Sequence, residues 1–269
     1  MEAPDSLAPE QIVPNLGTRW LAHSYHYLRK TGSTNDYALR LAAEGAPHGT
    51  LVVAEEQSKG RGRLNREWIS YPSLGIYLSM LLRNPLPLRV APQSTYIGAL
   101  ALVKALREEF GISASIKWPN DVLINGRKAA GILTEMQSDP DLSRFIVMGI
   151  GINVNHSTEE MGGPFRYPAT SIAIELGFTV KRQRVLLQFL SQFEKQYDRF
   201  EQNGILDLIA EMEAHSAILG KIITVVCGKR EIVGRALGFT SEGALLLLGE
   251  DGSQETVWAG EVLRVEGAA

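Results

Sequence analysis

The spacing of hydrophobic residues predicts both helices and strands up to about residue 217. Apolar residues three to four positions apart predict a long amphipathic helix at 182–203, and two further helices are expected at 35–43 and 92–110. Short apolar runs predict buried strands in the remaining segments, at 51–54, 74–82, 116–118, 122–124, 131–135 and 145–154. This region therefore combines a sheet with helices.

Several residues mark where these elements begin and end. Gly111 follows the second predicted helix, as expected for a residue that ends a helix in the left-handed conformation. Ser33 or Thr34 can cap the start of the first predicted helix with a hydroxyl group. Asn125-Gly126 is a preferred dipeptide in two-residue turns, so it predicts a hairpin.

The pattern changes after about residue 220, where short strands alternate with glycine-containing turns. The strands are expected at 222–226, 231–239, 244–248 and 255–259. This spacing is typical of a small antiparallel barrel or sandwich. We therefore predict three parts: a flexible, acidic and proline-rich arm at 1–18, a larger domain at 19–217, and a small β-barrel domain at 218–269.

Composition narrows the class of protein. The chain has 269 residues, 45% apolar and 21% charged, which is typical of soluble globular proteins that bury a core without disulfides. A formal net charge of −3 argues against nucleic-acid binding as its main task. The N-terminus lacks a secretory signal, and no apolar stretch is long enough to span a membrane. The single cysteine, Cys227, excludes an intrachain disulfide and fits the reducing cytoplasm.

A loop rich in glycine and arginine is the first candidate for chemistry. Gly60-Arg61-Gly62-Arg63 combines a flexible backbone with forked guanidinium donors, which suits a polyphosphate or an acyl phosphate. Such a loop is expected to be mobile when empty and to become ordered around its ligand. The same residues are also typical of a solvated basic loop or an RNA contact, so on spacing alone both interpretations stay open.

Two neighbouring motifs add a carboxylate and a lysine. In Lys117-Trp118-Pro119-Asn120-Asp121, the proline favours an extended backbone, so Asn120 and Asp121 are expected at a strand edge. A carboxylate there can hold magnesium or accept a proton. Lys128 follows the predicted turn and can pair with a carboxylate and a phosphate. The structural alternatives are a turn with a packed tryptophan and a hairpin with an exposed lysine.

Small and polar residues at two further places suit close contact with a ligand. Gly149-Ile150-Gly151-Ile152-Asn153 alternates glycine with isoleucine, which indicates that something packs against the backbone of a buried strand, or that the strand bulges. It lacks the glycine spacing and the following helix of a dinucleotide-binding fingerprint. Ser33-Thr34-Asn35 offers groups that either cap a helix or bind the polar end of a ligand.

In this order and at these intervals, the motifs resemble those of the biotin–protein ligase family in its monofunctional bacterial form. The resemblance runs from about Ser33 to the C-terminus. It rests on five motifs: Ser33-Thr34-Asn35, the loop Gln57…Gly60-Arg61-Gly62-Arg63…Trp68, Lys117-Trp118-Pro119-Asn120-Asp121, Arg127-Lys128 with Gly131, and Gly149-Ile150-Gly151-Ile152-Asn153.

The resemblance implies an α+β fold: a mixed sheet flanked by helices, like the class II aminoacyl-tRNA synthetase catalytic domain, plus a small C-terminal β-barrel. It implies biotin and ATP as substrates, with Mg²⁺ held mainly by the ATP phosphates. The implied biotin-binding residues are Ser33, Thr34, Asn35, Gln57, Arg61, Gly62, Arg63, Lys128, Gly131 and Gly149. The implied nucleotide-binding residues are Arg61, Arg63, Trp68, Asn120, Lys128 and Asn153. The implied catalytic residues are Lys128, Arg63 and Asp121.

The resemblance also implies a partner, a biotin carboxyl carrier protein whose lysine accepts the biotin in the cytoplasm. No nucleic acid or membrane is expected, and a homodimer is compatible with the sequence. Only 32 residues precede Ser33, too few for the DNA-binding helix-turn-helix domain of bifunctional members, so no repressor role is expected. The segment Leu64-Asn65-Arg66-Glu67 is less basic than in some members, which argues against nucleotide contacts there.

Two other functions remain as alternatives. A lipoate–protein ligase or octanoyltransferase shares the fold, but those relatives lack the Gly-Arg-Gly-Arg loop followed by Trp-Pro-Asn-Asp. A non-catalytic biotin sensor would bind the vitamin without activating it.

Overall fold

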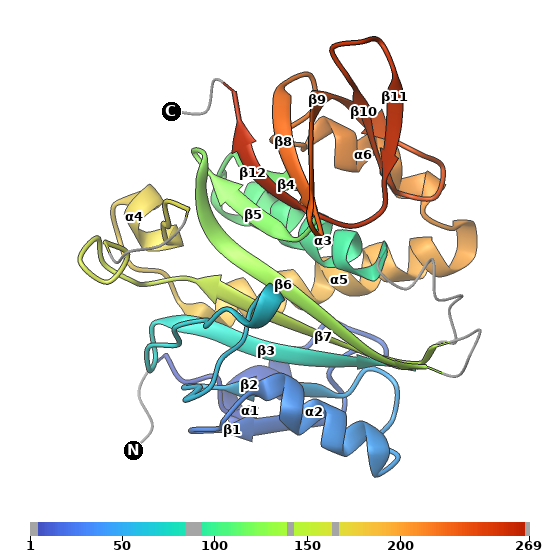
Figure 1. Ribbon diagram of the computed structural model, residues 1–269. Coiled ribbons are helices and arrows are strands. Elements are labelled where there is room, and N and C mark those ends of the chain that lie inside the picture. The colour runs from blue at the N-terminus through green and yellow to red at the C-terminus, as the bar shows by residue number, and fades with distance from the viewer. Residues whose placement is uncertain (1–4, 84–92, 139–142, 163–166, 267–269) are drawn as a thin grey trace.

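Two sheets and the helices packed on them make up the protein (Figure 1). The computed structural model describes residues 5–83, 93–138, 143–162 and 167–266. The larger sheet has seven strands in the order β1-β2-β3-β7-β6-β5-β4. In it β1 and β2 run parallel and the other neighbouring pairs are antiparallel, so the predicted mixed sheet is confirmed.

Most element bounds lie close to the predicted ones, but the strand predicted at 131–135 is longer and spans Arg127–Ser138. The strands of the larger sheet are β1 (Tyr25–Leu28), β2 (Leu51–Ala54), β3 (Gly75–Leu82), β4 (Ala114–Lys117), β5 (Asp121–Ile124), β6 (Arg127–Ser138) and β7 (Ser143–Asn153). Those of the smaller sheet are β8 (Ile222–Cys227), β9 (Arg230–Phe239), β10 (Leu245–Leu248), β11 (Gln254–Val257) and β12 (Glu261–Val265). The helices are α1 (Pro9–Ile12), α2 (Thr34–Ala43), α3 (Ser94–Phe110), α4 (Ile172–Leu176), α5 (Arg182–Asn203) and α6 (Leu206–Ala214), with 3₁₀ turns η1 (Val13–Asn15) and η2 (Arg63–Asn65).

The turn and helix-end predictions are confirmed. Asn125 and Gly126 both have positive φ, as their two-residue turn between β5 and β6 requires. Gly111 is left-handed and ends α3. The helix expected from Pro92 begins at Ser94, and Pro92 lies outside the described residues. Short elements without a strong periodic signal were not predicted: β1, α4, α6 and β12.

The two faces of the larger sheet are covered differently. Ile132, Ile150 and Met148 point to α3, where they surround Gly98, and this face belongs to the main hydrophobic core with α3 and α5. The opposite face carries Val52, Leu81 and Val147, which pack under α2 in a smaller cluster. Because side chains alternate along a strand, the residues between the core positions line the second face, where the candidate site lies.

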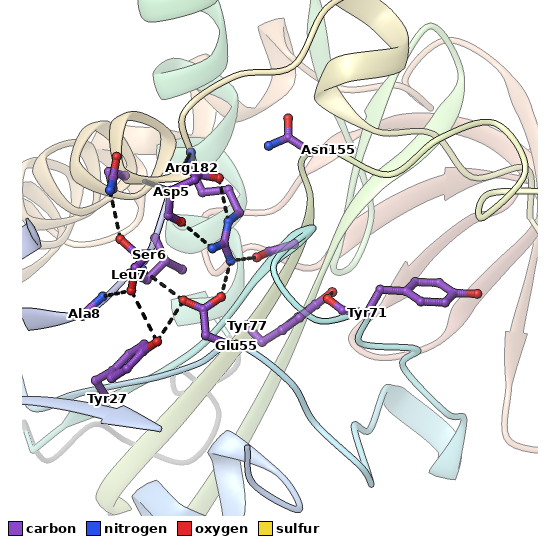
Figure 2. A network of polar contacts seen from close by, with 12 residues as sticks. Asp5, Ser6, Leu7, Ala8, Tyr27, Glu55, Tyr71, Tyr77, Asn155 and Arg182 are labelled. Carbon is purple, nitrogen blue, oxygen red and sulfur yellow. Dashed lines mark hydrogen bonds and ion pairs between the residues drawn. The ribbon is translucent and has the colours of Figure 1, made fainter. Parts of the chain in front are cut away.

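The N-terminal segment is more ordered than its composition suggests. We predicted a flexible arm at 1–18, but from Asp5 onward the chain packs on the body of the protein, with Leu7 and Ile12 fully buried. Asp5 pairs with the buried guanidinium of Arg182 on α5, as Figure 2 shows. The acidic, proline-rich composition of this segment predicted a loose arm. The burial of Leu7 and Ile12 and the ion pair of Asp5 with a residue 177 positions away leave no signal in the local sequence.

The C-terminal domain is an antiparallel sheet, as predicted, but it is not a closed barrel. Its strands follow the order β11-β10-β9-β8-β12. Within the described residues no hydrogen-bonded pairing joins β11 to β12, so both are edge strands. Strand and turn spacing alone cannot distinguish an open sheet from a barrel, because closure depends on how far the strands tilt and stagger.

Candidate functional site

A cavity of about 250 Å³ opens on the second face of the larger sheet and reaches the C-terminal domain. Every residue assigned to a site from the sequence lines it: Ser33, Thr34, Asn35, Gln57, Arg61, Gly62, Arg63, Trp68, Asn120, Asp121, Lys128, Gly131, Gly149 and Asn153. Segments more than a hundred residues apart in sequence therefore meet at one place. Pockets of this kind, apolar with a few converging polar groups, are the usual form of a small-molecule site.

Strand alternation explains the glycines of this cavity. In β7, Ile150 and Ile152 belong to the core, whereas Gly149 lines the cavity and Gly151 faces the Trp68 indole. A Cβ at Gly149 would overlap the Asn35 amide, and a Cβ at Gly151 would overlap the indole of Trp68. The alternation of glycine with isoleucine therefore marks close packing of side chains on a strand rather than a bulge.

The N-terminus of α2 forms one wall. Ser33 occupies the N-cap position with an extended backbone, but its side chain makes no capping hydrogen bond. The Gln57 Oε1 accepts hydrogen bonds from the Thr34 amide at 2.8 Å and from its hydroxyl at 3.1 Å. The Gln57 side chain thus provides a hydrogen-bond acceptor for a backbone N–H in the first turn of α2, and it lies beside the Ser-Thr-Asn motif.

The glycine–arginine loop folds back on itself as an irregular hairpin. Isolated bridges join Gln57 to Ser70 and Arg61 to Glu67. Leu64 and Asn65 at its tip both have positive φ, near 57° and 56°. The indole of Trp68 lies against Gly131 and Gly151, and its Nε1 has no hydrogen-bond partner among the described residues. The hairpin therefore covers the strands that floor the cavity.

The two arginines of the loop differ in their surroundings. Burial lowers the pKa of the Arg61 guanidinium, but hydrogen bonds to Asp36 and Glu135 outweigh it and the net pKa is raised. Burial lowers the pKa of Arg63, and its polar partners are neutral: the Gly260 carbonyl at 3.1 Å and the Asn120 Oδ1 at 3.4 Å. These hydrogen-bond partners carry no charge, so the Arg63 guanidinium can bind an incoming anion.

Lys128 and Asp121 form the charged centre of the site. A β-bulge between β5 and β6 puts Lys128 opposite Leu123, on the same face as Asp121 and Gly131. The Lys128 Nζ lies 2.6 Å from the Asp121 Oδ1 and 5.5 Å from the centre of the Trp68 ring. The sequence predicted a lysine able to pair with a carboxylate, and this pairing is observed.

Two asparagines hold the backbone around this pair. The Asn120 Nδ2 donates to the Ile132 carbonyl at 2.9 Å, and the Asn153 Nδ2 donates to the Thr170 carbonyl at 3.0 Å. Thr170 in turn donates its amide to the Lys128 carbonyl. Both amides thereby fix the strands that carry Lys128 and Asp121.

Sequence reasoning missed several residues of the site. Tyr167 places its ring 3.6 Å from the Lys117 Nζ, and Val262 and Leu263 of β12 complete the rim. Asp36 and Glu135 hold Arg61 from just outside the cavity. A signal existed for Glu135, since it lies four residues after Gly131 on the same strand face, whereas β12 gave no recognisable pattern.

The cavity combines apolar walls with several positively charged side chains. Arg63, Lys117 and Lys128 are among the cations that line it, and Trp68, Ile69 and Leu133 supply apolar surface. Such a site suits a ligand with an apolar body and an anionic end, held against a second anion.

Comparison with known proteins identifies relatives that match most of the chain. The Biotin/lipoate A/B protein ligase family model matches residues 27–153, and the Biotin protein ligase C terminal domain model matches residues 218–265. The bifunctional ligase/repressor BirA of Bacillus subtilis is 37% identical over 94% of this chain and 78% of its own length. The biotin–[acetyl-CoA-carboxylase] ligase of Paracoccus denitrificans is 34% identical over 84% of this chain and 95% of its own.

A solved structure extends this similarity to the fold. The biotin protein ligase of Aquifex aeolicus, solved in complex with biotin and ATP, is 30% identical with a TM-score of 0.77. The alignment covers 89% of this chain and 97% of that chain. The similarity therefore includes both the larger sheet and the C-terminal one.

Proposed function

The chain belongs to the biotin/lipoate A/B protein ligase family, and on that premise we propose that it activates biotin with ATP and transfers it to a lysine of an acceptor protein. The observation that carries the proposal is the cavity in which Arg63, Lys128 and Asp121 meet over an apolar floor. Biotin has an apolar body and a carboxylate, and ATP brings phosphates, so both ligands suit these groups.

The first step joins two anions. A biotin carboxylate oxygen attacks the α-phosphorus of ATP, the bond to the β-phosphate oxygen breaks, and pyrophosphate leaves biotinyl-AMP behind. Repulsion between the carboxylate and the phosphate must be offset by cations already in place. Arg63 and Lys128 supply them, and the Asp121 carboxylate 2.6 Å from the Lys128 Nζ holds that ammonium in position.

The second step breaks the mixed anhydride. The amine of the acceptor lysine attacks the carbonyl of biotinyl-AMP, an amide bond forms, and AMP leaves. The amine must be neutral to attack, so a group has to orient it or take its proton. Asp121 lines the cavity beside Lys128, and we assign this role to it. The hairpin over the cavity would exclude water from the anhydride.

All of the residues proposed to bind ligand line the cavity, and their division between biotin and the nucleotide follows the family resemblance. We propose that Ser33, Thr34, Asn35, Gln57, Arg61, Gly62, Arg63, Lys128, Gly131 and Gly149 surround biotin. We propose that Arg61, Arg63, Trp68, Asn120, Lys128 and Asn153 lie nearer the nucleotide. For Asn120 and Asn153 the contacts to backbone carbonyls favour a role in shaping the site.

Magnesium is proposed to arrive with the nucleotide. Among the described residues no group of three or more His, Cys, Asp and Glu side chains is arranged to hold a metal ion. Asp121, one of the carboxylates that line the cavity, is already paired with Lys128. Mg²⁺ commonly binds through substrate phosphates and water, and its charge would partly neutralise the triphosphate.

The acceptor is proposed to be a biotin carboxyl carrier protein, and the reaction to occur in the cytoplasm, with a homodimer compatible with this function. Relatives named biotin–[acetyl-CoA-carboxylase] ligase support the choice of acceptor. Within the described residues no helix has the length and apolar character needed to cross a bilayer.

Biotin-dependent exchange of pyrophosphate into ATP tests the proposed function. Exchange with biotin is expected, because adenylation is reversible and needs no acceptor. Exchange with lipoate or octanoate instead would identify an acyl ligase of the same superfamily, which the matched biotin protein ligase C-terminal domain disfavours. Biotin binding without exchange would identify a sensor and overturn the proposal.

Substitution of Lys128 tests the charged centre. Lys128→Ala removes an ammonium that offsets repulsion between the two substrates, so exchange should fall by about 10²-fold or more. Lys229→Ala is the matched control, because Lys229 is exposed in the turn between β8 and β9. Full activity of Lys128→Ala would exclude the assigned role.

A further inference from the structure

The side chain of Arg61 is held by two carboxylates from different elements. Its Nη1 lies 2.7 Å from the Asp36 Oδ1 on α2, and its Nη2 lies 3.2 Å from both carboxylate oxygens of Glu135 on β6. One positive charge thus faces two negative ones. Such a guanidinium is less suited to offset the charge of a phosphate than Arg63, whose partners are neutral.

Glu135 also fixes Asn35, a residue of the Ser-Thr-Asn motif. The Asn35 Nδ2 donates to the Glu135 Oε2 at 2.7 Å, and its Oδ1 accepts from the buried Ser79 hydroxyl at 2.6 Å. Gly149 leaves space for this amide, because a Cβ there would overlap the Asn35 Oδ1. The carboxylate of Glu135 is therefore held in place by Asn35 in addition to its contact with Arg61.

Arg61 stands where the hairpin begins. It bridges to Glu67 on the returning strand, and the Gly62 amide donates to the Arg66 carbonyl. Holding Arg61 at the sheet and α2 therefore holds the base of the whole hairpin. Two residues later Arg63 reaches the C-terminal domain at the Gly260 carbonyl.

We propose that Glu135 is a positioning residue that, together with Asp36, clamps the hairpin of residues 60–67 over the cavity through Arg61. The clamp sets how often the hairpin opens and hence how fast ligand leaves. This inference deepens the proposed function and rests on it for the identity of the ligand. The clamp itself is a property of the empty protein and is measurable without any substrate.

Glu135→Gln removes the charge of the clamp but keeps an oxygen that can accept from Asn35. Ion pairs exposed to this degree stabilise by a few tenths to about 1 kcal/mol, so the hairpin should open about two- to fivefold more often. The matched control is Glu255→Gln, because Glu255 also pairs with an arginine, Arg230, and its side chain is 30% exposed against 32% for Glu135. Asp36→Asn is a second test at a more exposed position.

Trypsin reports opening in the absence of ligand, since Arg63 and Arg66 lie in the hairpin. Cleavage after these residues, followed by mass spectrometry, should be about two- to fivefold faster in Glu135→Gln and unchanged in Glu255→Gln. Asp36→Asn should also be faster. Release of labelled biotin chased by unlabelled biotin should accelerate by a similar factor, because leaving requires the same opening.

A double-mutant cycle separates the clamp from general support of the strand. If Glu135 acts through Arg61, Glu135→Gln should not speed cleavage further once Arg61→Met is present. Fully additive effects in the two variants, or wild-type cleavage in Glu135→Gln, would overturn the inference. Failure of the wild type to support biotin-dependent exchange would instead overturn the proposed function and leave the cleavage result standing.

Discussion

Two arginines, each held by two carboxylates, serve different purposes in this protein. Arg182 on α5 pairs with Asp5 and Glu55, and its side chain is 1% exposed. Arg61 pairs with Asp36 and Glu135, and its side chain is 34% exposed. Both sets join one guanidinium to two carboxylates, so the difference in solvent exposure decides how much each set contributes to stability. A buried charge must stay paired, whereas an exposed one can leave its partners for water.

The set around Arg182 ties the N-terminal segment to the sheet (Figure 2). The Arg182 Nη1 donates to the Glu55 Oε2 at 2.6 Å and to the Gly75 carbonyl at 3.0 Å, and the Glu55 Oε1 accepts from the Leu7 amide. Glu55 directly follows β2 and stands two residues before Gln57. The buried ion pairs of Arg182 therefore fix the start of the segment that leads from β2 to the hairpin of residues 60–67.

The largest effect is expected from removing the buried arginine. Arg182→Ala leaves Glu55 and Asp5 without their partner, so the free energy of unfolding should fall by about 3–5 kcal/mol. Urea denaturation measures this, with Arg230→Ala as an exposed control. A loss below about 1 kcal/mol would mean that burial does not distinguish the two arginines.

A second prediction concerns pH in the same buried region. Burial lowers the pKa of His156 to about 4, although Glu160 opposes the shift, and its Nε2 lies 3.4 Å from the Tyr77 hydroxyl. Histidine in the unfolded chain titrates near pH 6.5, so between about pH 6.5 and 4 the unfolded state binds more protons. Stability should therefore fall as pH decreases through this window, by at most about 3 kcal/mol, and this contribution should level off below about pH 4.

Substitution separates this histidine from other titrating groups. In His156→Gln the difference in unfolding free energy between pH 7 and pH 4.5 should shrink relative to wild type. Urea denaturation at both pH values gives that difference. An unchanged difference would mean that His156 is protonated in the folded protein, against the burial of its ring.

The contrast between the two sets also explains what sequence could and could not predict. Gly149, Lys128 and Asp121 were found because their spacing relative to turns and strands is local, and strand alternation then brings them to one face. Asp5 was missed because its partner, Arg182, lies far along the chain. Glu135 was missed although it shares a strand face with Gly131, because its pairing with Arg61 is not visible in the local sequence. No local pattern encodes a pairing of residues 177 positions apart.

The same reasoning applies to the fold. Long periodic segments such as Arg182–Asn203 were predicted to the residue, since burying one face of a helix needs a repeating pattern. β12 has five residues and an intermittent apolar pattern, so its sequence does not separate it from a loop. Its position beside β8 depends on the rest of the smaller sheet. For this reason the sequence did not predict that β12 lines the cavity.

A smaller effect is expected at the exposed arginine. Arg61→Ala should lower the free energy of unfolding by about 1 kcal/mol or less, because water replaces the lost ion pairs of Asp36 and Glu135. Urea denaturation in parallel with Arg182→Ala gives the comparison directly. A loss as large as that of Arg182→Ala would show that the hairpin is part of the cooperative core rather than a separate opening unit.

The smallest effect is expected where the hairpin meets the C-terminal sheet. Arg66 donates from Nη1 and Nη2 to the two Glu261 oxygens, at 2.5 and 2.6 Å, on a half-exposed surface. A cycle of Arg66→Ala, Glu261→Ala and the double variant should give a coupling of about 0.5 kcal/mol in urea denaturation. Added salt should reduce it, since exposed charges are screened within about 10 Å at 0.1 M ionic strength. A coupling above about 2 kcal/mol that salt leaves unchanged would show that this pair behaves like the buried ion pairs of Arg182. The hairpin would then be held firmly at the C-terminal sheet as well as at Arg61.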